Sequence, residues 1–426
     1  MAGQKRDAIQ IQDSACSATG SLAALSLPPT FEKVSTMPVK NRYAEWLPEI
    51  TEWRRDFHQH PELLFEVHRT AARVAELLRE FGCDEVVEGI GRTGVVGVIK
   101  GKDTGSGKVV GLRADMDALP IIETTGLDYA SKTPGMMHAC GHDGHTSMLL
   151  GAAKYLCETR NFDGTAVVIF QPAEEGGAGG LEMCRDGLME KFGIQEVYGM
   201  HNAPGIPVGH FAIRPGALLA SSDEFEIIVT GKGGHAAEPH AAIDTTLVAA
   251  HILVALQTIV SRNVDPLKRV VLTVGTFETD SSASNIIAHT VRMNGTVRTL
   301  DAEYREFAEK RIREITENTA AAHGAKAEIN WQTGYPVTVN TPENTVYAAD
   351  VARSVSANVN DNVNPIMPAE DFSYMLEERP GAYIFLGNGD TAQCHHPAYN
   401  FDDEAIPFGS SWYSGMIEAR MPDGEA

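Results

Sequence analysis

The chain has 426 residues, 43% of them hydrophobic and 22% charged, which is typical of a folded protein of about two or three domains and excludes a wholly disordered chain. Its 35 basic and 57 acidic side chains give a formal net charge of −22, which argues against a nucleic-acid partner. No run of about 18 consecutive apolar residues occurs, so we expect no transmembrane helix and no membrane partner. The six cysteines stand singly, which indicates reduced thiols in a cytoplasmic protein.

The N-terminal stretch differs from the rest of the chain. Its first 36 residues are rich in Ser, Ala, Thr and Gln and show no sustained hydrophobic period. From Met37 on, the sequence has patterns typical of regular secondary structure. We expect residues 1–42 to be a disordered extension. Either the stretch before Met37 is a real leader or the start codon is assigned upstream of the true one, and we favour the second.

Residues 43–217 alternate between amphipathic helices and short apolar strands. Helical spacing predicts one helix from Tyr43 to Gln59 and a second from Glu66 to Phe81, which Gly82 ends. Between turns rich in glycine, the pattern predicts a helix at 144–158 and strands at 95–99, 109–114, 166–170 and 195–198. This alternation predicts an α/β fold with a largely parallel sheet.

After Gly216 the order changes to β-α-β-β-α-β, which is the order of a ferredoxin-like unit. The predicted elements are strands at 225–234, 270–278, 289–297 and 327–332, a long helix from Asp244 to Arg262, and a helix over 301–323 with Asp301 as its N-cap. From Tyr335 helices and strands resume, up to a helix over 404–419. We therefore expect a discontinuous domain over 43–217 and 333–420, with an α+β domain of residues 218–332 inserted into it.

The densest group of reactive side chains is MHACGHDGHTSMLLG at 137–151. It holds His138, Cys140, His142 and His145, beside Asp143, in a turn before an apolar helix. Thiolate and imidazole are favoured ligands of borderline-soft divalent metals. Because alternate residues of an extended turn point the same way, Cys140 and His142 can reach one metal site.

A pair of glutamates follows the strand at 166–170. FQPAEEGGAGG places Glu174 and Glu175 at the carboxyl end of that strand, where open α/β sheets bind ligands. Adjacent side chains usually point apart. We therefore expect the two glutamates to divide the work, one on the metal and one free to move protons.

Three further groups lie near predicted strand ends. His201 stands in GMHNAPG just past the strand at 195–198, and His395 and His396 stand in QCHHPAYNFDDE. Asp115 and Asp117 in RADMDALP suit a supporting hydrogen bond to a histidine ligand. Together with the two clusters above, these groups offer more ligands than one metal needs. They predict a two-metal site with a bridging thiolate or carboxylate.

Other hydrolase and nucleotide motifs are absent from the sequence. There is no HExxH zinc motif and no GxSxG nucleophile elbow. GKDTGSGKV at 101–109 lacks the glycine spacing of a Walker A loop.

The motifs ADMDALP, MHACGHDGH, QPAEEGGAG, MHN, GKGGHAAEPH, AEDFS and HHPxY occur together and in this order, as in the M20 metallopeptidase family. The chain resembles that family over residues 43–420. It is most similar to the amidohydrolase branch of hippurate hydrolases, N-acyl-amino-acid amidohydrolases and auxin-conjugate hydrolases. The resemblance implies a catalytic domain with two divalent metals, Mn²⁺ or Zn²⁺ with Co²⁺ or Ni²⁺ as alternatives. It also implies an inserted lid domain through which two copies form a homodimer.

The resemblance further implies a role for each motif residue. The metal ligands would be Cys140 as the bridge, with His142, Glu175, His201 and His395. The last of these is chosen over its neighbour His396 because it stands two residues before the proline.

Four other residues take roles from the same resemblance. Glu174 would be the general base. His235 would reach the neighbouring subunit's active site and stabilise the oxyanion. Asn285 and Arg298 would lie near the substrate carboxylate.

The reaction implied is hydrolysis of the amide bond of an N-acyl amino acid, hippurate-like or N-acetylated. Glu174 would take a proton from a water between the metals and deliver it to the leaving amine. A dipeptidase or carboxypeptidase of the same family is the alternative. Two other classes compete less well: a thiol hydrolase with Cys140 as nucleophile leaves the glutamates and His201 without a role, and an inert metal-binding relative would be expected to lose Glu174.

Overall fold

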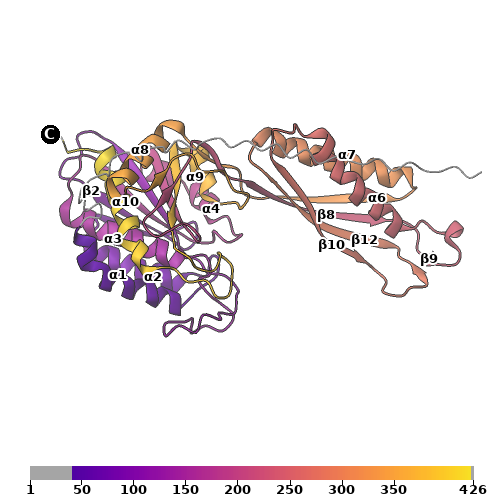
Figure 1. Cartoon of the computed structure of the whole chain (residues 1–426), viewed down its shortest axis with the longest axis horizontal. Helices are drawn as coiled ribbons and strands as arrows, with labels where there is room; N and C mark the ends of the chain where they lie inside the picture. The colour runs from indigo at the N-terminus through magenta and orange to yellow at the C-terminus, as the bar shows by residue number, and fades with distance from the viewer. Residues whose placement is uncertain (1–40, 424–426) are drawn as a thin grey trace, which may run out of the picture. The chain divides into compact units, whose positions relative to one another are not determined.

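A mixed eight-stranded sheet carries the first and last parts of the chain (Figure 1). The computed structural model describes residues 41–423, and the order of this sheet is β1-β2-β4-β3-β5-β16-β6-β15. Its four central strands are parallel neighbours: β4 (Thr165–Gln171), β3 (Val109–Asp115), β5 (Glu196–Ala203) and β16 (Gly381–Gly387). The predicted parallel sheet is therefore confirmed at its centre.

The edges of this sheet differ from the prediction. β1 (Glu85–Ile90) and β2 (Gly94–Lys100) form an antiparallel pair at one edge, and β2 runs antiparallel to β4. At the other edge β6 (Phe211–Ala212) is antiparallel to β16 and parallel to β15 (Val359–Asn360). A tight turn joins β1 to β2, so they need no crossover helix.

Helices cover both faces of the large sheet, which explains why its strands are continuous apolar runs. Alternate residues of one strand enter different cores: Val168 packs with one set of helices and Ile169 with the other. The first face carries α1 (Asn41–Gln59), α2 (His68–Phe81), α3 (His142–Thr159), α8 (Pro342–Val355) and α10 (Ile406–Arg420). The second carries α4 (Gly179–Arg185), α5 (Leu188–Lys191) and α9 (Phe372–Glu378).

Helix limits agree with the sequence patterns to within a few residues. Gly82 ends α2 in the left-handed conformation, with φ of 86°, as the sequence predicts. The predicted extension over residues 1–42 falls mostly on residues 1–40, which lie outside the described residues. The last two residues of the predicted extension, 41 and 42, belong to α1, so the predicted end of the extension is wrong by two residues.

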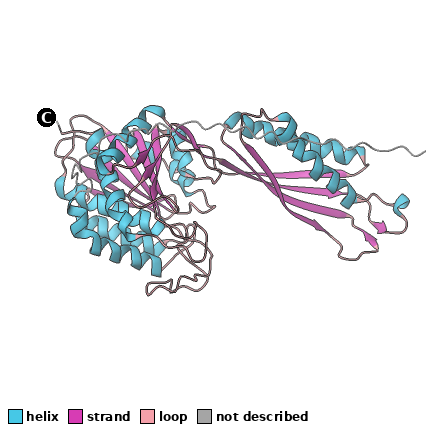
Figure 2. Cartoon of the chain, in the orientation of Figure 1, coloured by secondary structure: helices cyan, strands magenta, loops and turns pink. Residues whose placement is uncertain are grey.

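A second sheet has four antiparallel strands in the order β10-β12-β8-β13 (Figure 2). The strands are β8 (Ser221–Thr230), β10 (Val270–Thr279), β12 (Thr290–Thr299) and β13 (Lys326–Thr333). With α6 (Thr245–Thr258) and α7 (Ala302–Ala322) they make the predicted ferredoxin-like unit around a separate core. The side chain of Asp301 caps α7, as predicted, by accepting from the backbone N–H of Glu303. The domain limits at 217/218 and 332/333 stay predictions.

The helix predicted from Asp244 to Arg262 is interrupted. α6 ends at Thr258 and a π-helical turn, η2 (Ile259–Asn263), follows. The segment Thr245–Asn263 is long and apolar enough to span a membrane by length and composition alone, a test that core helices of soluble proteins also pass. One side of it packs in the core of the second sheet, whereas Leu247 and Val254 on the other side are 53% and 67% exposed.

Short elements complete the described chain. β7 (Gly216–Leu219) precedes the second sheet in the chain and pairs with β14 (Thr338–Asn340), which follows the last strand of that sheet. A small ribbon within the insert pairs β9 (Gly234–His235) with β11 (Ile286–Ile287). The 3-10 turns are η1 (Pro239–Ala241) and η3 (Asp403–Ala405).

Candidate active site

Most of the predicted site residues line one cavity of about 870 Å³. Side chains from the ends of the central strands, from the segment just before α3 and from the loop after β16 line it, including Cys140, Glu174, Glu175, His201 and His395. Residues of the second sheet and of its connections complete the wall, including Ser222, Arg298, Gln332 and Tyr335. The structure thus brings together residues from segments that are far apart in the sequence.

The loop after β4 determines the positions of Glu174 and Glu175. The carboxylate of Asp117 accepts hydrogen bonds from the backbone N–H groups of Glu174 at 2.9 Å and Glu175 at 3.1 Å. Ala173 before them has φ of 55° and Gly176 after them 98°, so the loop turns sharply at both positions. The sequence suggested that the two carboxylates point apart, but in the structure they converge. Both lie about 4 Å from Nε2 of His142, at 4.0 and 3.9 Å.

Two histidines are held so that Nε2 is free for a ligand. Nδ1 of His142 lies 2.8 Å from the carbonyl oxygen of Asp117, and its buried Nε2 has no hydrogen-bond partner. Nδ1 of His201 lies 2.6 Å from the carbonyl oxygen of Asn202, and its Nε2 lies 3.4 Å from Sγ of Cys140. A carbonyl on the second ring nitrogen is the usual support of a metal-binding histidine. His201 lies within β5, not past its end as predicted.

Two sets of three donor atoms meet at one sulfur. Cys140, His142 and His201 form one set, and Cys140, Glu175 and His395 form the other. Within each set the ligand atoms lie within 4.8 Å of one another. Mixed sulfur, nitrogen and oxygen donors suit borderline-soft divalent cations. The shared thiol is placed where a ligand that bridges two cations would lie.

The two adjacent histidines, His395 and His396, differ in their contacts. His395 reaches Glu175, with Nε2 and Oε1 3.2 Å apart, and its backbone has φ of 67°, a costly conformation for a non-glycine residue. His396 instead accepts a hydrogen bond at Nδ1 from the backbone N–H of Ala398 and joins no donor set.

The charges around the donors also favour a cation. Burial alone would lower the pKa of His142, but Asp115 and Asp117 raise it to about 10. Burial, together with Glu370 and Glu175, raises the pKa of Glu174 well above its usual value. The metal-free site therefore retains protons to balance its surplus of carboxylates. A divalent cation supplies the same compensation, so the residues present fit bound metals.

Asp115 lies behind the donors, as the sequence predicts. Its carboxylate lies 2.6 Å from Nδ1 of His145, accepts from Arg113 at 2.7 Å, and lies 3.7 Å from Nε2 of His142. Arg113 is fully buried and also donates to Glu370 and Asp371 at 2.9 Å each. Arg113, Glu370 and Asp371 stand in the motifs RADMDALP and AEDFS, but no pattern in the sequence assigns these three residues a role.

Tyr335 is a further residue of the site that was not predicted from the sequence. Its hydroxyl donates to the backbone carbonyl of Glu174 and accepts from the backbone N–H groups of Gly176 at 2.8 Å and Ala178 at 3.3 Å. The residue stands just after β13, so the connection back from the second sheet braces the glutamate loop. No local pattern in the sequence marks this contact.

Some predicted site residues lie elsewhere. His138 is buried, neither ring nitrogen has a partner, and it joins no donor set. His235 and Asn285 are both exposed and adjacent, since the N–H of Ala236 donates to the carbonyl of Asn285. They do not line the cavity of their own chain, whereas Arg298 does.

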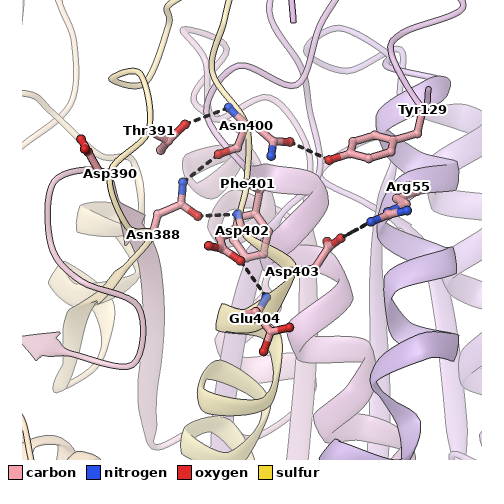
Figure 3. A pocket seen from close by; sticks show the side chains of 10 residues that line it. All are labelled: Arg55, Tyr129, Asn388, Asp390, Thr391, Asn400, Phe401, Asp402, Asp403 and Glu404. Atoms are coloured by element: carbon pink, nitrogen blue, oxygen red, sulfur yellow. Dashed lines mark hydrogen bonds and ion pairs between the residues drawn. The ribbon is translucent and has the colours of Figure 1, made fainter. Parts of the chain in front are cut away.

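A smaller polar cavity of about 460 Å³ lies along the loop that carries His395, and hydrogen bonds between residues that line this cavity hold the loop in place (Figure 3). Asn388 accepts from the backbone N–H of Asp402 at 2.8 Å and donates to the carbonyl of Asn400 at 3.0 Å. Tyr129 donates to the side chain of Asn400 at 3.0 Å, and Arg55 donates to Asp403. These bonds hold both ends of the loop against the large domain.

The fold and the donor set together define a metal-dependent hydrolase. The family model of peptidase family M20/M25/M40 matches residues 111–419, and the chain belongs to this family.

Individual relatives agree with this assignment. The chain is 44% identical over 370 residues to hippurate hydrolase of Campylobacter jejuni, covering 86% of this chain and 95% of that protein. It is 44% identical to N-acetyl-L-cysteine deacetylase of Bacillus subtilis, covering 83% of each. Among solved structures it is similar to the YXEP protein of Bacillus subtilis, a dinuclear metal-binding peptidase of the M20 family. That match has a TM-score of 0.78 and 33% identity, and covers 89% of this chain and 99% of that one.

Proposed function

We propose that the chain hydrolyses the amide bond of N-acyl amino acids that carry a free carboxylate, with two divalent metals as cofactors. The observation that carries the proposal is the meeting of two donor sets at Cys140, beside a glutamate that belongs to neither of them. The similarity to a hippurate hydrolase and to an N-acetyl-L-cysteine deacetylase supports this substrate class.

Cys140, His142, Glu175, His201 and His395 would hold the metals. We propose Mn²⁺ or Zn²⁺, with Co²⁺ or Ni²⁺ as alternatives, because this donor set does not choose among them. When bound, the metals supply Lewis acidity and lower the pKa of water. Without a cation, the hydrogen bond with Cys394 and burial raise the pKa of the Cys140 thiol.

Glu174 is the residue placed to move protons. Its carboxylate stands on a loop that backbone contacts with Asp117 and Tyr335 hold in place. It would accept a proton from the attacking water and pass it to the leaving amine. Arg298, in the cavity wall, would bind the substrate carboxylate through its guanidinium.

A homodimer through the inserted domain would complete the site. Its exposed residues offer a surface: Leu247 and Val254 on α6, and Val271, 40% exposed, on the edge strand β10. His235 and Asn285, which lie outside the cavity of their own chain, would enter the partner's cavity. This arrangement would give the exposed ribbon β9–β11 a catalytic role.

A substrate panel tests the proposal. The chelated enzyme should be inactive, and added Mn²⁺ or Zn²⁺ should restore hydrolysis of hippurate or N-acetyl amino acids. Faster hydrolysis of dipeptides would favour the peptidase alternative. Full activity of a metal-free preparation that iodoacetamide abolishes would instead identify Cys140 as a nucleophile.

A further inference from the structure

A second thiol lies beside Cys140 and has no role in the proposed reaction. Cys394 lines the same cavity, and its Sγ lies 3.9 Å from the backbone carbonyl oxygen of Cys140. Both cysteines are free in the structure.

The backbones of the two segments run side by side at this point. The N–H of His395 donates to the carbonyl of Ala139 at 2.7 Å, which joins the residues next to the two cysteines. A disulfide forms without a large backbone shift where the two Cα atoms lie about 4.4–6.8 Å apart, and this short backbone contact beside both cysteines favours such a bond.

The loop is also held in place for this contact. The bonds of Asn388 and Asn400 fix the chain on both sides of Cys394 (Figure 3). These bonds limit the movement of the segment that carries Cys394.

We propose that Cys140 and Cys394 form a reversible disulfide when the metal-free enzyme meets a peroxide, and that this bond blocks metal binding. The effect on catalysis rests on the proposed function, because Cys140 is the donor common to both sets. The disulfide itself does not depend on that function.

The chemistry is that of two thiols and one peroxide. One thiol loses its proton, its thiolate attacks a peroxide oxygen, the O–O bond breaks, and a sulfenic acid forms while the leaving hydroxide takes up that proton and departs as water. The second thiolate attacks that sulfur, the S–O bond breaks, the S–S bond forms, and a second water leaves. Two sulfurs are oxidised and the peroxide is reduced. A dithiol reverses the reaction by exchange.

Peptide mapping under non-reducing conditions tests the proposal. The full chain is treated with hydrogen peroxide after metal removal or after loading with Zn²⁺, alkylated, digested and analysed by mass spectrometry. We expect a peptide linked through Cys140 and Cys394 in the metal-free sample and its loss in the Zn²⁺-loaded sample. Dithiothreitol should remove the link and restore Zn²⁺ binding.

Cys394→Ser is the matched variant. Without its partner, Cys140 should oxidise beyond the sulfenic state, so dithiothreitol should no longer restore Zn²⁺ binding. Circular dichroism before oxidation confirms that the variant is folded. Zn²⁺ binding that recovers in Cys394→Ser as fully as in the unmodified chain would overturn the proposal.

A second thiol pair serves as an internal reference. Sγ of Cys83 lies 3.6 Å from Sγ of Cys157, in a different part of the large domain. A Cys83–Cys157 link without a Cys140–Cys394 link would show that oxidant reached buried thiols and would also overturn the proposal. Cys83→Ser should leave the Cys140–Cys394 link unchanged. Inactivity of the untreated Zn²⁺ enzyme on every substrate would count against the proposed function alone, because the link and Zn²⁺ binding are measured without substrate.

Discussion

The hydroxyl of Tyr335 donates a hydrogen bond to the backbone carbonyl of Glu174. It links the segment that returns from the second sheet to the loop that carries the proposed general base. The same oxygen accepts from two backbone N–H groups further along that loop, at Gly176 and Ala178. Any movement of the returning segment is thereby transmitted to Glu174.

Tyr335→Phe removes these hydrogen bonds and keeps the ring. We expect kcat to fall by about tenfold, because a hydrogen bond of about 1–1.5 kcal/mol that positions the base is lost. KM and metal content should change little, since no metal donor is altered. The control is Tyr374→Phe: that hydroxyl binds the carbonyl of Gly334 and does not touch the glutamate loop. Equal losses in both variants would mean that Tyr335 only stabilises the fold.

Glu174→Gln tests the base itself. The amide keeps the size of the side chain but cannot take up the proton, so kcat should fall by about 10²- to 10⁴-fold. Metal content, measured by mass spectrometry, should stay that of the unmodified protein. Glu175→Gln is the matched variant and should lose metal as well as activity. Activity of Glu174→Gln within about twofold of the unmodified chain would remove Glu174 from its role.

Much of the fold and of the donor set was predictable from local patterns. Apolar runs marked the central strands, and strand ends marked the place of Glu174 and Glu175, because the carboxyl ends of parallel strands share one edge of the sheet. The family motifs then selected His395 over its neighbour. In the structure His395 joins a donor set and His396 does not.

Other features depend on contacts that no local pattern records. The convergence of the two glutamates requires the left-handed turn at Ala173 and the carboxylate of Asp117, which lies on a different loop. The role of Tyr335 depends on a segment that returns from the far end of the insert. The antiparallel edge of the large sheet was missed because strand periodicity carries no information about direction.

An ion pair at the start of β5, the end of this strand that lies away from the metal donors, is expected to stabilise the protein in a pH-dependent way. Glu196 accepts from Arg420 at 2.9 Å and is 5% exposed. Burial opposes its ionisation, but hydrogen bonds from Arg420 and Lys108 lower the pKa of Glu196 overall. A carboxyl whose folded pKa is lowered stabilises the protein above its unfolded pKa, near 4.3, and this contribution is lost as pH falls through the folded value.

Glu196→Gln should therefore lower the free energy of unfolding at pH 7 by about 1–3 kcal/mol. The difference from the unmodified chain should shrink as pH falls below about 4. Urea unfolding of both proteins at several pH values measures it. Glu378→Gln, at an exposed site, is the control and should change stability little. A difference between Glu196→Gln and the unmodified chain that is independent of pH would show that packing, not charge, accounts for the loss.

The last prediction concerns His235, which lies on the exposed ribbon β9–β11 beside Asn285. If this imidazole donates to the oxyanion in the partner's cavity, His235→Ala should lower kcat by about 10²- to 10³-fold. Metal content should be unchanged, because His235 joins no donor set. His240→Ala, at another exposed histidine of the insert, is the control and should stay active.

Subunit mixing separates action across the dimer from action within one chain. His235→Ala and Glu174→Gln homodimers should each be nearly inactive. In a heterodimer, the cavity with an intact Glu174 faces the chain with an intact His235, so one complete site forms if the histidine acts across the interface. Mixing equal amounts with full exchange should restore about a quarter of the unmodified activity, since half of the dimers are mixed and each has one good site. Size-exclusion chromatography and native mass spectrometry verify the heterodimer. A verified heterodimer without activity would leave His235 with no role in the partner's site.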